Sequence, residues 1–196
     1  MPKIVDHDQR RVELVDATWR IIAERGLDGA TMRDIAAEAG FANGALKPYF
    51  PTKDRLLDFA FEHIFDQTNR RMRASTEGLS GLAALRAYCH EILPLDEEKV
   101  SEARVAIAFW QKALRDPAKA AVHERSMEQW RVALAELLEE TGLRRGVRLD
   151  DAVGAIMDLV LGAQITATLS PTHHAPRQLV AQLDCLVSAL VEGASA

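Results

Sequence analysis

Residues 31–57 read TMRDIAAEAGFANGALKPYFPTKDRLL, and this stretch decides how the rest of the chain is interpreted. Thr31 can accept a hydrogen bond from a free backbone N–H of a first helical turn, and Asp34 stands three residues on, as in a capping box. Gly40 stands where a helix commonly ends in a left-handed residue. The pattern therefore predicts a helix of about two turns between these signals.

A second short helix is expected at residues 44–47, after the corner formed by residues 41–43. Pro48 removes one backbone N–H and crowds the preceding turn, so this second helix should be short. Two short helices joined by a tight turn that contains Gly form a helix-turn-helix. In such a unit the second helix enters the DNA major groove and its first residues reach base edges.

Several side chains of this stretch suit contacts with DNA. Asn43 can offer a paired donor and acceptor to adenine, Lys47 can reach a guanine or a phosphate, and Gly44 leaves room for close approach. A third helix is expected to begin with Thr52 as its N-cap, which places Lys53 where the helix dipole already favours an anion. The candidate DNA-binding residues are Thr31, Arg33, Asn43, Gly44, Lys47, Tyr49 and Lys53.

The same stretch resembles the DNA-binding region of the TetR family of bacterial repressors. Ala42, Lys47 and Pro48 depart from the family's commonest pattern. The resemblance implies a helix-turn-helix domain at residues 1–52 and an effector-binding and dimerisation domain at residues 53–196, which together act on a palindromic operator. The matching residues are Thr31, Arg33, Asp34, Ile35, Ala36, Ala39, Gly40, Gly44, Leu46, Tyr49, Phe50, Lys53, Leu56 and Leu57.

The composition is that of a soluble globular protein, with 196 residues, 48% hydrophobic and 27% charged. Residues 1–55 hold nine basic and nine acidic side chains, so the net charge of -5 comes from the remainder of the chain. Attraction to DNA must then rest on the local placement of basic residues.

No feature of the sequence calls for a metal or a cofactor. Cys89 and Cys185 form no CxxC motif, and the pair His173 and His174 lacks the spacing of a metal site. No secretion signal is evident, and the most apolar run, residues 152–169, is short for a membrane span. We therefore expect a cytoplasmic protein with no membrane partner.

The whole chain is expected to be all-α, with about nine helices. Residues 8–25 predict a first helix with Trp19 in the core. A helix from Lys53 to about Ser75 has apolar residues on more than one face, so it should contact both the helix-turn-helix and a second core. We interpret its basic end, residues 69–73, as a solvated helix end rather than a DNA surface. Gly and Pro separate further helices at about 80–93, 98–115, 117–141, 149–169 and 176–192.

Aromatic and polar residues of the second domain could line a cavity for an apolar or cationic organic effector. Large aromatic residues also dominate ordinary cores, so simple packing is the competing interpretation. Residues 109–117, FWQKALRDP, resemble the effector segment in the branch that contains the choline-responsive regulator of betaine synthesis, although this does not identify the ligand. The candidates are Phe61, Phe65, Tyr88, Phe109, Trp110, Trp130 and Gln164, with His90 and Met127 as further members.

The last two helices carry more apolar surface than one small domain can cover. The resemblance implies that they pair with their copies in a four-helix dimer interface. The candidate interface residues are Leu159, Leu179, Leu183, Leu186 and Leu190.

Two other classes of function remain open beside a ligand-responsive repressor. An α-helical enzyme built on a former regulator would need a convergent acid, base or metal set, which the sequence lacks. A DNA-bound regulator without a small-molecule site would have a filled core in its second domain. A cavity there separates the repressor from this last class.

Overall fold

The computed structural model describes residues 14–15, 17–18, 20–22, 31–42 and 46–193, and those residues confirm the all-α class. Helical residues between Leu14 and Ile22 precede the numbered helices. The helices are α2 (Met32–Glu38), α3 (Lys53–Thr76), α4 (Gly81–Ile92), α5 (Glu97–Ala113), α6 (Pro117–Thr141), α7 (Leu149–Leu169) and α8 (Pro176–Leu190). Within the described ranges the extended pairing is one isolated antiparallel bridge between Leu143 and Val191.

The ends of the helices follow the expected capping signals. The Asp34 N–H donates to the Thr31 hydroxyl at 3.2 Å, and the Thr31 N–H donates back to the Asp34 carboxylate at 3.1 Å. Thr52 caps α3 by accepting from the Arg55 N–H at 3.2 Å. Gly40 has a φ of 72°, which a residue with a Cβ rarely adopts. The predicted capping box, N-cap and left-handed glycine are therefore confirmed.

The expected second helix of the helix-turn-helix is the main difference in local structure. Residues 43–45 lie outside the described residues, and Leu46–Tyr49 form a turn rather than a helix. The N–H groups of Tyr49 and Phe50 both donate to the Leu46 carbonyl, at 2.9 and 2.8 Å. Pro48 has no N–H to continue a ladder of such bonds, which accounts for the turn at the described end of this expected helix.

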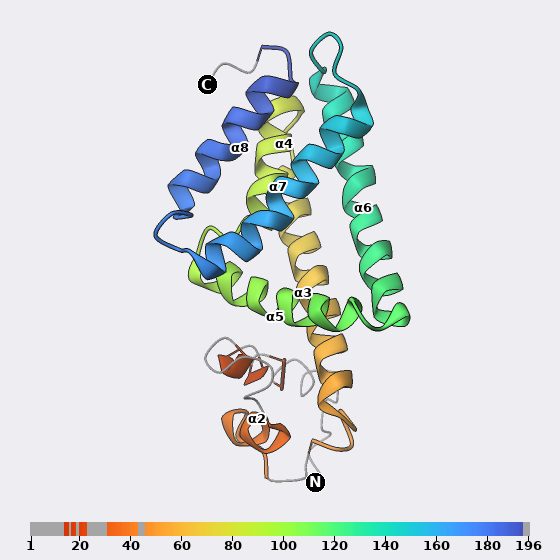
Figure 1. Cartoon of the computed structure of the whole chain (residues 1–196), viewed down its shortest axis with the longest axis vertical. Helices are drawn as coiled ribbons and strands as arrows, with labels where there is room; N and C mark the ends of the chain where they lie inside the picture. The colour runs from red at the N-terminus through yellow and green to blue at the C-terminus, as the bar shows by residue number, and fades with distance from the viewer. Residues whose placement is uncertain (1–13, 16, 19, 23–30, 43–45, 194–196) are drawn as a thin grey trace.

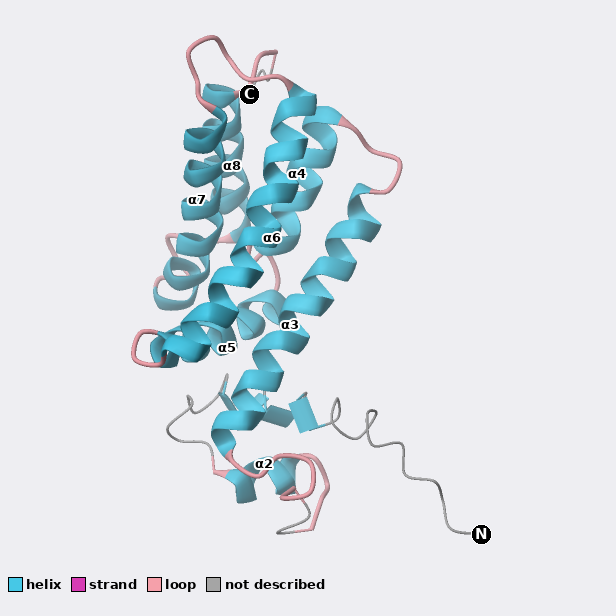
Figure 2. Cartoon of the chain, turned by 90° about the vertical axis from the view of Figure 1, so that its right-hand side faces the viewer, coloured by secondary structure: helices cyan, strands magenta, loops and turns pink. Residues whose placement is uncertain are grey.

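Helix α3 connects the two ends of the molecule (Figure 1). It starts beside α2 and runs into the body formed by the later helices (Figure 2), while α5 lies across the base of that body (Figure 1). We call the described residues up to Thr52 the headpiece. Its core holds Leu14, Ile21, Ile35, Ala36, Leu46 and Phe50, which pack against Leu56 of α3.

A second cluster joins the headpiece to the body. Val15 and Ile22 of the first helical segment share this cluster with Leu57, Ala60, Phe61 and Ile64 of α3 and with Val105, Ala106, Ala108 and Phe109 of α5. The third and largest cluster lies within the body, among α3, α4, α6, α7 and α8. Helix α3 contributes to all three clusters, as its broad apolar surface predicted.

By length and composition alone, α7 is apolar enough to cross a membrane. Its buried residues, which include Ile156 and Val160, belong to the largest cluster. A core helix of a soluble protein has the same composition, and the packing of α7 agrees with that interpretation.

Candidate functional site

The candidate DNA-binding residues lie around α2 and the start of α3. Arg33 and Lys47 are exposed, whereas Tyr49 and Lys53 are half-buried. The ring of Tyr49 meets that of Phe41 edge-on, with centroids 6.1 Å apart. Asn43 and Gly44 lie outside the described residues, as does Trp19.

Thr31 has a structural role in this group. Its hydroxyl accepts from the Asp34 N–H and donates to the Asp34 carboxylate at 2.5 Å, so its single O–H is already engaged. Thr31 therefore fixes the start of α2, and Arg33 is exposed in its first turn.

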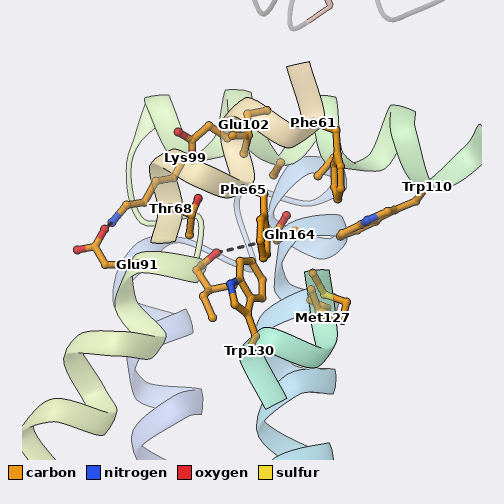
Figure 3. A pocket seen from close by; sticks show the side chains of 15 residues that line it. Phe61, Phe65, Thr68, Glu91, Lys99, Glu102, Trp110, Met127, Trp130 and Gln164 are labelled. Carbon is orange, nitrogen blue, oxygen red and sulfur yellow. Dashed lines mark hydrogen bonds and ion pairs between the residues drawn. The ribbon is translucent and has the colours of Figure 1, made fainter. Parts of the chain in front are cut away.

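A cavity of about 30 Å³ lies among α3, α4, α5, α6 and α7 (Figure 3). We call it the aromatic cavity. Six of the predicted residues line it: Phe61, Phe65, Trp110, Met127, Trp130 and Gln164. Phe65 stacks on Trp130 with ring centroids 5.3 Å apart. Gln164 donates from Nε2 to the Ile92 carbonyl at 3.3 Å, which fixes the amide at the far wall.

Three of the predicted residues do not line the aromatic cavity. Phe109 is fully buried behind it, where its ring stacks on that of Phe61 with centroids 3.9 Å apart. Tyr88 and His90 of α4 lie elsewhere, and Tyr88 lines a separate groove. Helical spacing could not separate these positions, because adjacent aromatic residues on one helix can face either a cavity or the core behind it.

The polar side of the cavity was not predicted. Thr68, Glu91, Lys99 and Glu102 all line it, and Arg71 stands directly behind them. Arg71 donates from Nη1 and Nη2 to the two oxygens of Glu102, at 2.9 and 2.7 Å. Its Nε donates to Glu91 Oε2 at 3.2 Å. The signal in the sequence was Glu102, a carboxylate that stands three, four and seven residues before Val105, Ala106 and Phe109 on the buried face of α5.

Lys99 completes this group, which we call the Arg71 cluster: Arg71, Glu91, Lys99 and Glu102. Lys99 Nζ lies 3.1 Å from Glu91 Oε2 and donates to the His90 carbonyl at 3.1 Å. The interpretation of residues 69–73 as a solvated helix end is therefore wrong for Arg71, although Arg70 and Arg73 are exposed. The buried carboxylates explain the difference, because an ion pair with them offsets the cost of removing the guanidinium from water.

Burial also perturbs the titration of this cluster. Glu102 is 5% exposed, and its burial raises the pKa of the carboxyl above the ordinary value even though Arg71 lowers it. Burial alone would lower the pKa of Arg71, but the hydrogen bond and charge of Glu102, with those of Glu91, raise it. Pairing with Arg71 thus favours the charged form of Glu102, while desolvation opposes it.

A groove of about 410 Å³ runs between α3, α4 and α6 on the other side of Trp130. We call it the outer groove. Trp130 lines both the groove and the aromatic cavity, so its indole is their shared wall. The Trp130 Nε1–H donates to Asn69 Oδ1 at 2.8 Å, which holds the indole in that position.

A second group of charges, centred on buried Lys119, joins the headpiece end of α3 to the start of α6. Lys119 Nζ contacts Asp58 and lies 3.0 Å from Asp54 Oδ2. Burial alone would lower the pKa of Lys119, but its hydrogen bonds to Asp58 and Asp54 outweigh that effect and raise it. Lys119 also lies 5.9 Å from the centroid of Phe109, behind the aromatic cavity.

The predicted interface residues divide into two groups. Leu179 and Leu183 are 1% and 0% exposed within a single chain, so they face the core and have no surface for a partner copy. They were predicted for the interface because both the inner and the outer face of α8 carry apolar residues, and within one chain they belong to the inner face. Leu159, Leu186 and Leu190 are half-buried and keep exposed surface.

The exposed face of α7 carries apolar and small residues. Ile165 and Leu169 are 41% and 75% exposed. Gly154 and Gly162 have no other atom within 4 Å of the place where a Cβ would stand. On α8 the exposed residues include Ala181, Cys185 and Ala189.

Capped α2 and the start of α3 lie at one end of a helical body with an internal cavity, an arrangement expected of the class of transcriptional regulators. Two family models match the chain: "Bacterial regulatory proteins, tetR family" at residues 14–59 and "BetI-type transcriptional repressor, C-terminal" at residues 81–192. Among the described residues, no group of three or more His, Cys, Asp or Glu side chains could hold a metal ion.

Individual relatives agree with these family models. The chain is 34% identical over 176 residues to the HTH-type transcriptional regulator PksA of Bacillus subtilis, covering 88% of this chain and 85% of that protein. It is 34% identical over 124 residues to the HTH-type transcriptional regulator BetI of Burkholderia lata, covering 60% of this chain and 61% of that protein.

Two solved structures share the fold. A transcriptional regulator from Rhodococcus superposes with a TM-score of 0.83 at 29% identity, covering 93% of this chain and 96% of that one. A regulator from Saccharomonospora viridis, solved in complex with choline, superposes with a TM-score of 0.86 at 20% identity, covering 94% and 99%. The chain belongs to the TetR family of bacterial transcriptional regulators.

Proposed function

We propose that the protein is a ligand-responsive repressor that binds a palindromic operator as a dimer and is released by an organic effector in the aromatic cavity. In this proposal residues 1–52 bind DNA, residues 53–196 bind the effector and the partner copy, and the protein works in the cytoplasm without a membrane. The observation that carries it is the shared helix α3, which bears Lys53 at one end and Phe61 and Phe65 in the cavity wall.

Helix α3 places the cavity only a short distance from the residue that contacts DNA in this proposal. Eight residues separate Lys53 from Phe61, which is about 12 Å along a helix axis. A ligand that moves Phe61 or Phe65 therefore acts on the same rigid element that presents Lys53 to the DNA. The Lys119 contacts with Asp54 and Asp58 lie on this segment and connect it to α6.

The energy needed for release is modest. A ligand that binds the DNA-incompetent state tenfold more tightly supplies about 1.4 kcal/mol per site, so two sites of a dimer supply about 2.8 kcal/mol. A tilt of α3 changes the spacing of the two headpieces, which must match successive major grooves about 34 Å apart.

The proposed dimer uses the outer faces of α7 and α8. Exposed Ile165 and Leu169 supply apolar area, and Gly154 and Gly162 leave space for close approach of a second helix. Leu159, Leu186 and Leu190 add their exposed parts. Ile165→Glu should give a monomer in sedimentation, whereas Leu114→Glu, a change at an exposed leucine outside these helices, should leave a dimer.

An apolar or cationic effector is supported by the aromatic lining, since aromatic faces attract both. A second function, a regulator without a small-molecule site, is favoured by the volume of the cavity. At about 30 Å³ it has room for only a few water molecules, so an effector must displace a wall such as Trp130.

The DNA-binding half of the proposal is tested by selection from a random duplex pool at low salt. The protein should enrich a palindrome. Lys53→Ala should weaken all duplexes equally and lower the salt slope by about one, whereas Asn43→Ala should change the preferred sequence. Failure to prefer any duplex contradicts the proposal, and altered base preference in Lys53→Ala would reverse the two roles.

The effector half is tested by a screen for small molecules that release the enriched operator. Such a molecule should change the fluorescence of Trp110 or Trp130, and Trp110→Ala should bind operator yet need far more of the molecule for release. Leu114→Ala, an exposed change just beyond α5, is the matched control. Release of the Trp110→Ala protein at the wild-type concentration would place the effector site elsewhere.

A further inference from the structure

The charges around the aromatic cavity are already paired within the chain. Both oxygens of Glu102 accept from Arg71, and Oε2 of Glu91 accepts from Arg71 and lies 3.1 Å from Lys99 Nζ. Asp96, more than half exposed, stands 3.9 Å from Lys99 on the solvent side. The Arg71 cluster therefore has two positive and two negative charges.

A cationic ligand would find no carboxylate in this cavity that is free to pair with it. The Lys99 side chain is part of the wall and its ammonium lies beside the Glu91 carboxylate (Figure 3), so Glu91 is already paired and is not free to meet a ligand cation. Pairing the ligand with Glu91 or Glu102 would require breaking a buried ion pair, which leaves Lys99 or Arg71 without its partner. An anionic ligand meets the converse problem, because Glu91 and Glu102 also line the cavity.

One polar group in the wall has no partner. The Trp110 Nε1–H is buried and makes no hydrogen bond to any described residue. Buried donors of this kind nearly always find an acceptor, and a bound ligand is one source of it. Apart from the charged residues, Thr68 and Gln164, the remaining lining is apolar or aromatic and includes Phe61, Phe65, Met127 and Trp130.

We propose that the effector is an uncharged organic molecule with an apolar body and one hydrogen-bond acceptor, which receives the Trp110 Nε1–H. The Arg71 cluster makes the cavity select against quaternary ammonium ions despite its aromatic lining. This inference rests on the proposed function and narrows its effector class.

Three small probes of one shape separate the possible charges. Choline carries a quaternary nitrogen, neohexyl alcohol has carbon in its place, and the anion of tert-butylacetic acid carries a carboxylate. Titrations of the full-length protein, followed by tryptophan fluorescence, should give at least about tenfold tighter binding of the alcohol than of either ion, because each ion meets a like charge in the wall.

Substitution of Lys99 tests the origin of the selectivity. Lys99→Met removes the ammonium and leaves Glu91 with Arg71 alone, so choline should bind about tenfold more tightly than to wild type. The alcohol should change by less than about twofold, because its binding involves no charge. Lys112→Met is the matched control, since Lys112 is on the same helix but half-exposed and outside the cavity wall. Trp110→Phe keeps an aromatic ring without the donor and should weaken the alcohol about fivefold.

The outcomes are distinct. The assigned charge selectivity would be overturned if the wild-type protein bound choline more tightly than the alcohol. It would also be overturned if Lys99→Met and Lys112→Met raised the affinity for choline equally. If Trp110→Phe binds the alcohol as tightly as wild type does, the assigned contact between Trp110 and the ligand's acceptor is overturned. If none of the three probes binds to wild type or to Lys99→Met, the whole inference is overturned. Alcohol binding with the expected selectivity, but without release of operator, would instead contradict the proposed repressor function.

Discussion

Removal of Arg71 is the sharpest test of how the polar wall is held. In Arg71→Met the Glu102 carboxyl, which is 5% exposed, loses the two hydrogen bonds that now satisfy it. Breaking a buried pair by deleting one partner costs about 3–5 kcal/mol. Arg71 is itself 29% exposed, which favours the lower end, about 3 kcal/mol. For a chain of this size that lowers Tm by about 6–12 °C.

The loss should depend on pH with a definite sign. Burial raises the pKa of Glu102 in the folded state, so the folded protein binds a proton more readily than the unfolded chain does. Stability therefore falls as the pH rises from the unfolded pKa through the folded one. Arg71→Met removes an influence that lowers this pKa, so the window extends upward and the variant should be less impaired at about pH 5 than at about pH 8.

The assay is urea unfolding at a fixed protein concentration, because association with a partner copy also changes apparent stability. Glu102→Gln in the Arg71→Met background removes the unpaired charge and should recover most of the loss. The reasoning is refuted if Arg71→Met costs less than about 1 kcal/mol, if its cost is the same at both pH values, or if the double variant is no more stable than Arg71→Met.

Three further outcomes are expected. Cys185 is exposed on α8, while burial raises the pKa of Cys89 to about 12, so a maleimide should modify Cys185 alone. The rate of modification should fall as the protein concentration rises, because the proposed dimer covers α8. A rate independent of concentration would argue against an interface at α8. Asn69→Leu removes the acceptor that holds the Trp130 indole, so an effector should associate faster in stopped-flow fluorescence. An unchanged association rate would mean that Trp130 is not the residue that an entering effector displaces. Lys119→Met should lower the affinity for operator in the absence of effector, because the start of α3 then loses its ionic contacts with α6. Lys112→Met should have little effect, since Lys112 is half-exposed and lies 4.0 Å from Asp54. Equal effects of the two substitutions would show that the Lys119 contact does not position α3.

The helices could be predicted well because their signals are local. Thr31, Thr52 and Gly40 act on backbone groups within a few residues, so the sequence alone identifies them. The side of a helix that faces a particular partner is not local information. Leu183 and Cys185 stand two residues apart on an apolar helix, yet one is fully buried and the other is exposed.

The aromatic half of the cavity was also predictable, because large apolar residues at helical spacing must be buried. Its polar half was not, since Arg71 and Glu102 are 31 residues apart and their pairing depends on the packing of α3 against α5. A charged residue on an apolar helix face indicates that some partner exists. It does not indicate which one, and that choice decides whether the cavity carries a net charge.

Gly154 and Gly162 of α7, which have free space where a side chain would stand, have a consequence for the amount of protein in the cell. A glycine inside a helix destabilises it by about 1 kcal/mol relative to alanine, and at Gly154 and Gly162 no contact within the chain accounts for the absence of a side chain. If the close approach of a second copy offsets that cost, the separate protomer is the weaker folded species. Newly made chains at low copy number would then be preferential targets of proteolysis, and the expression level of the regulator would itself set how much functional regulator survives.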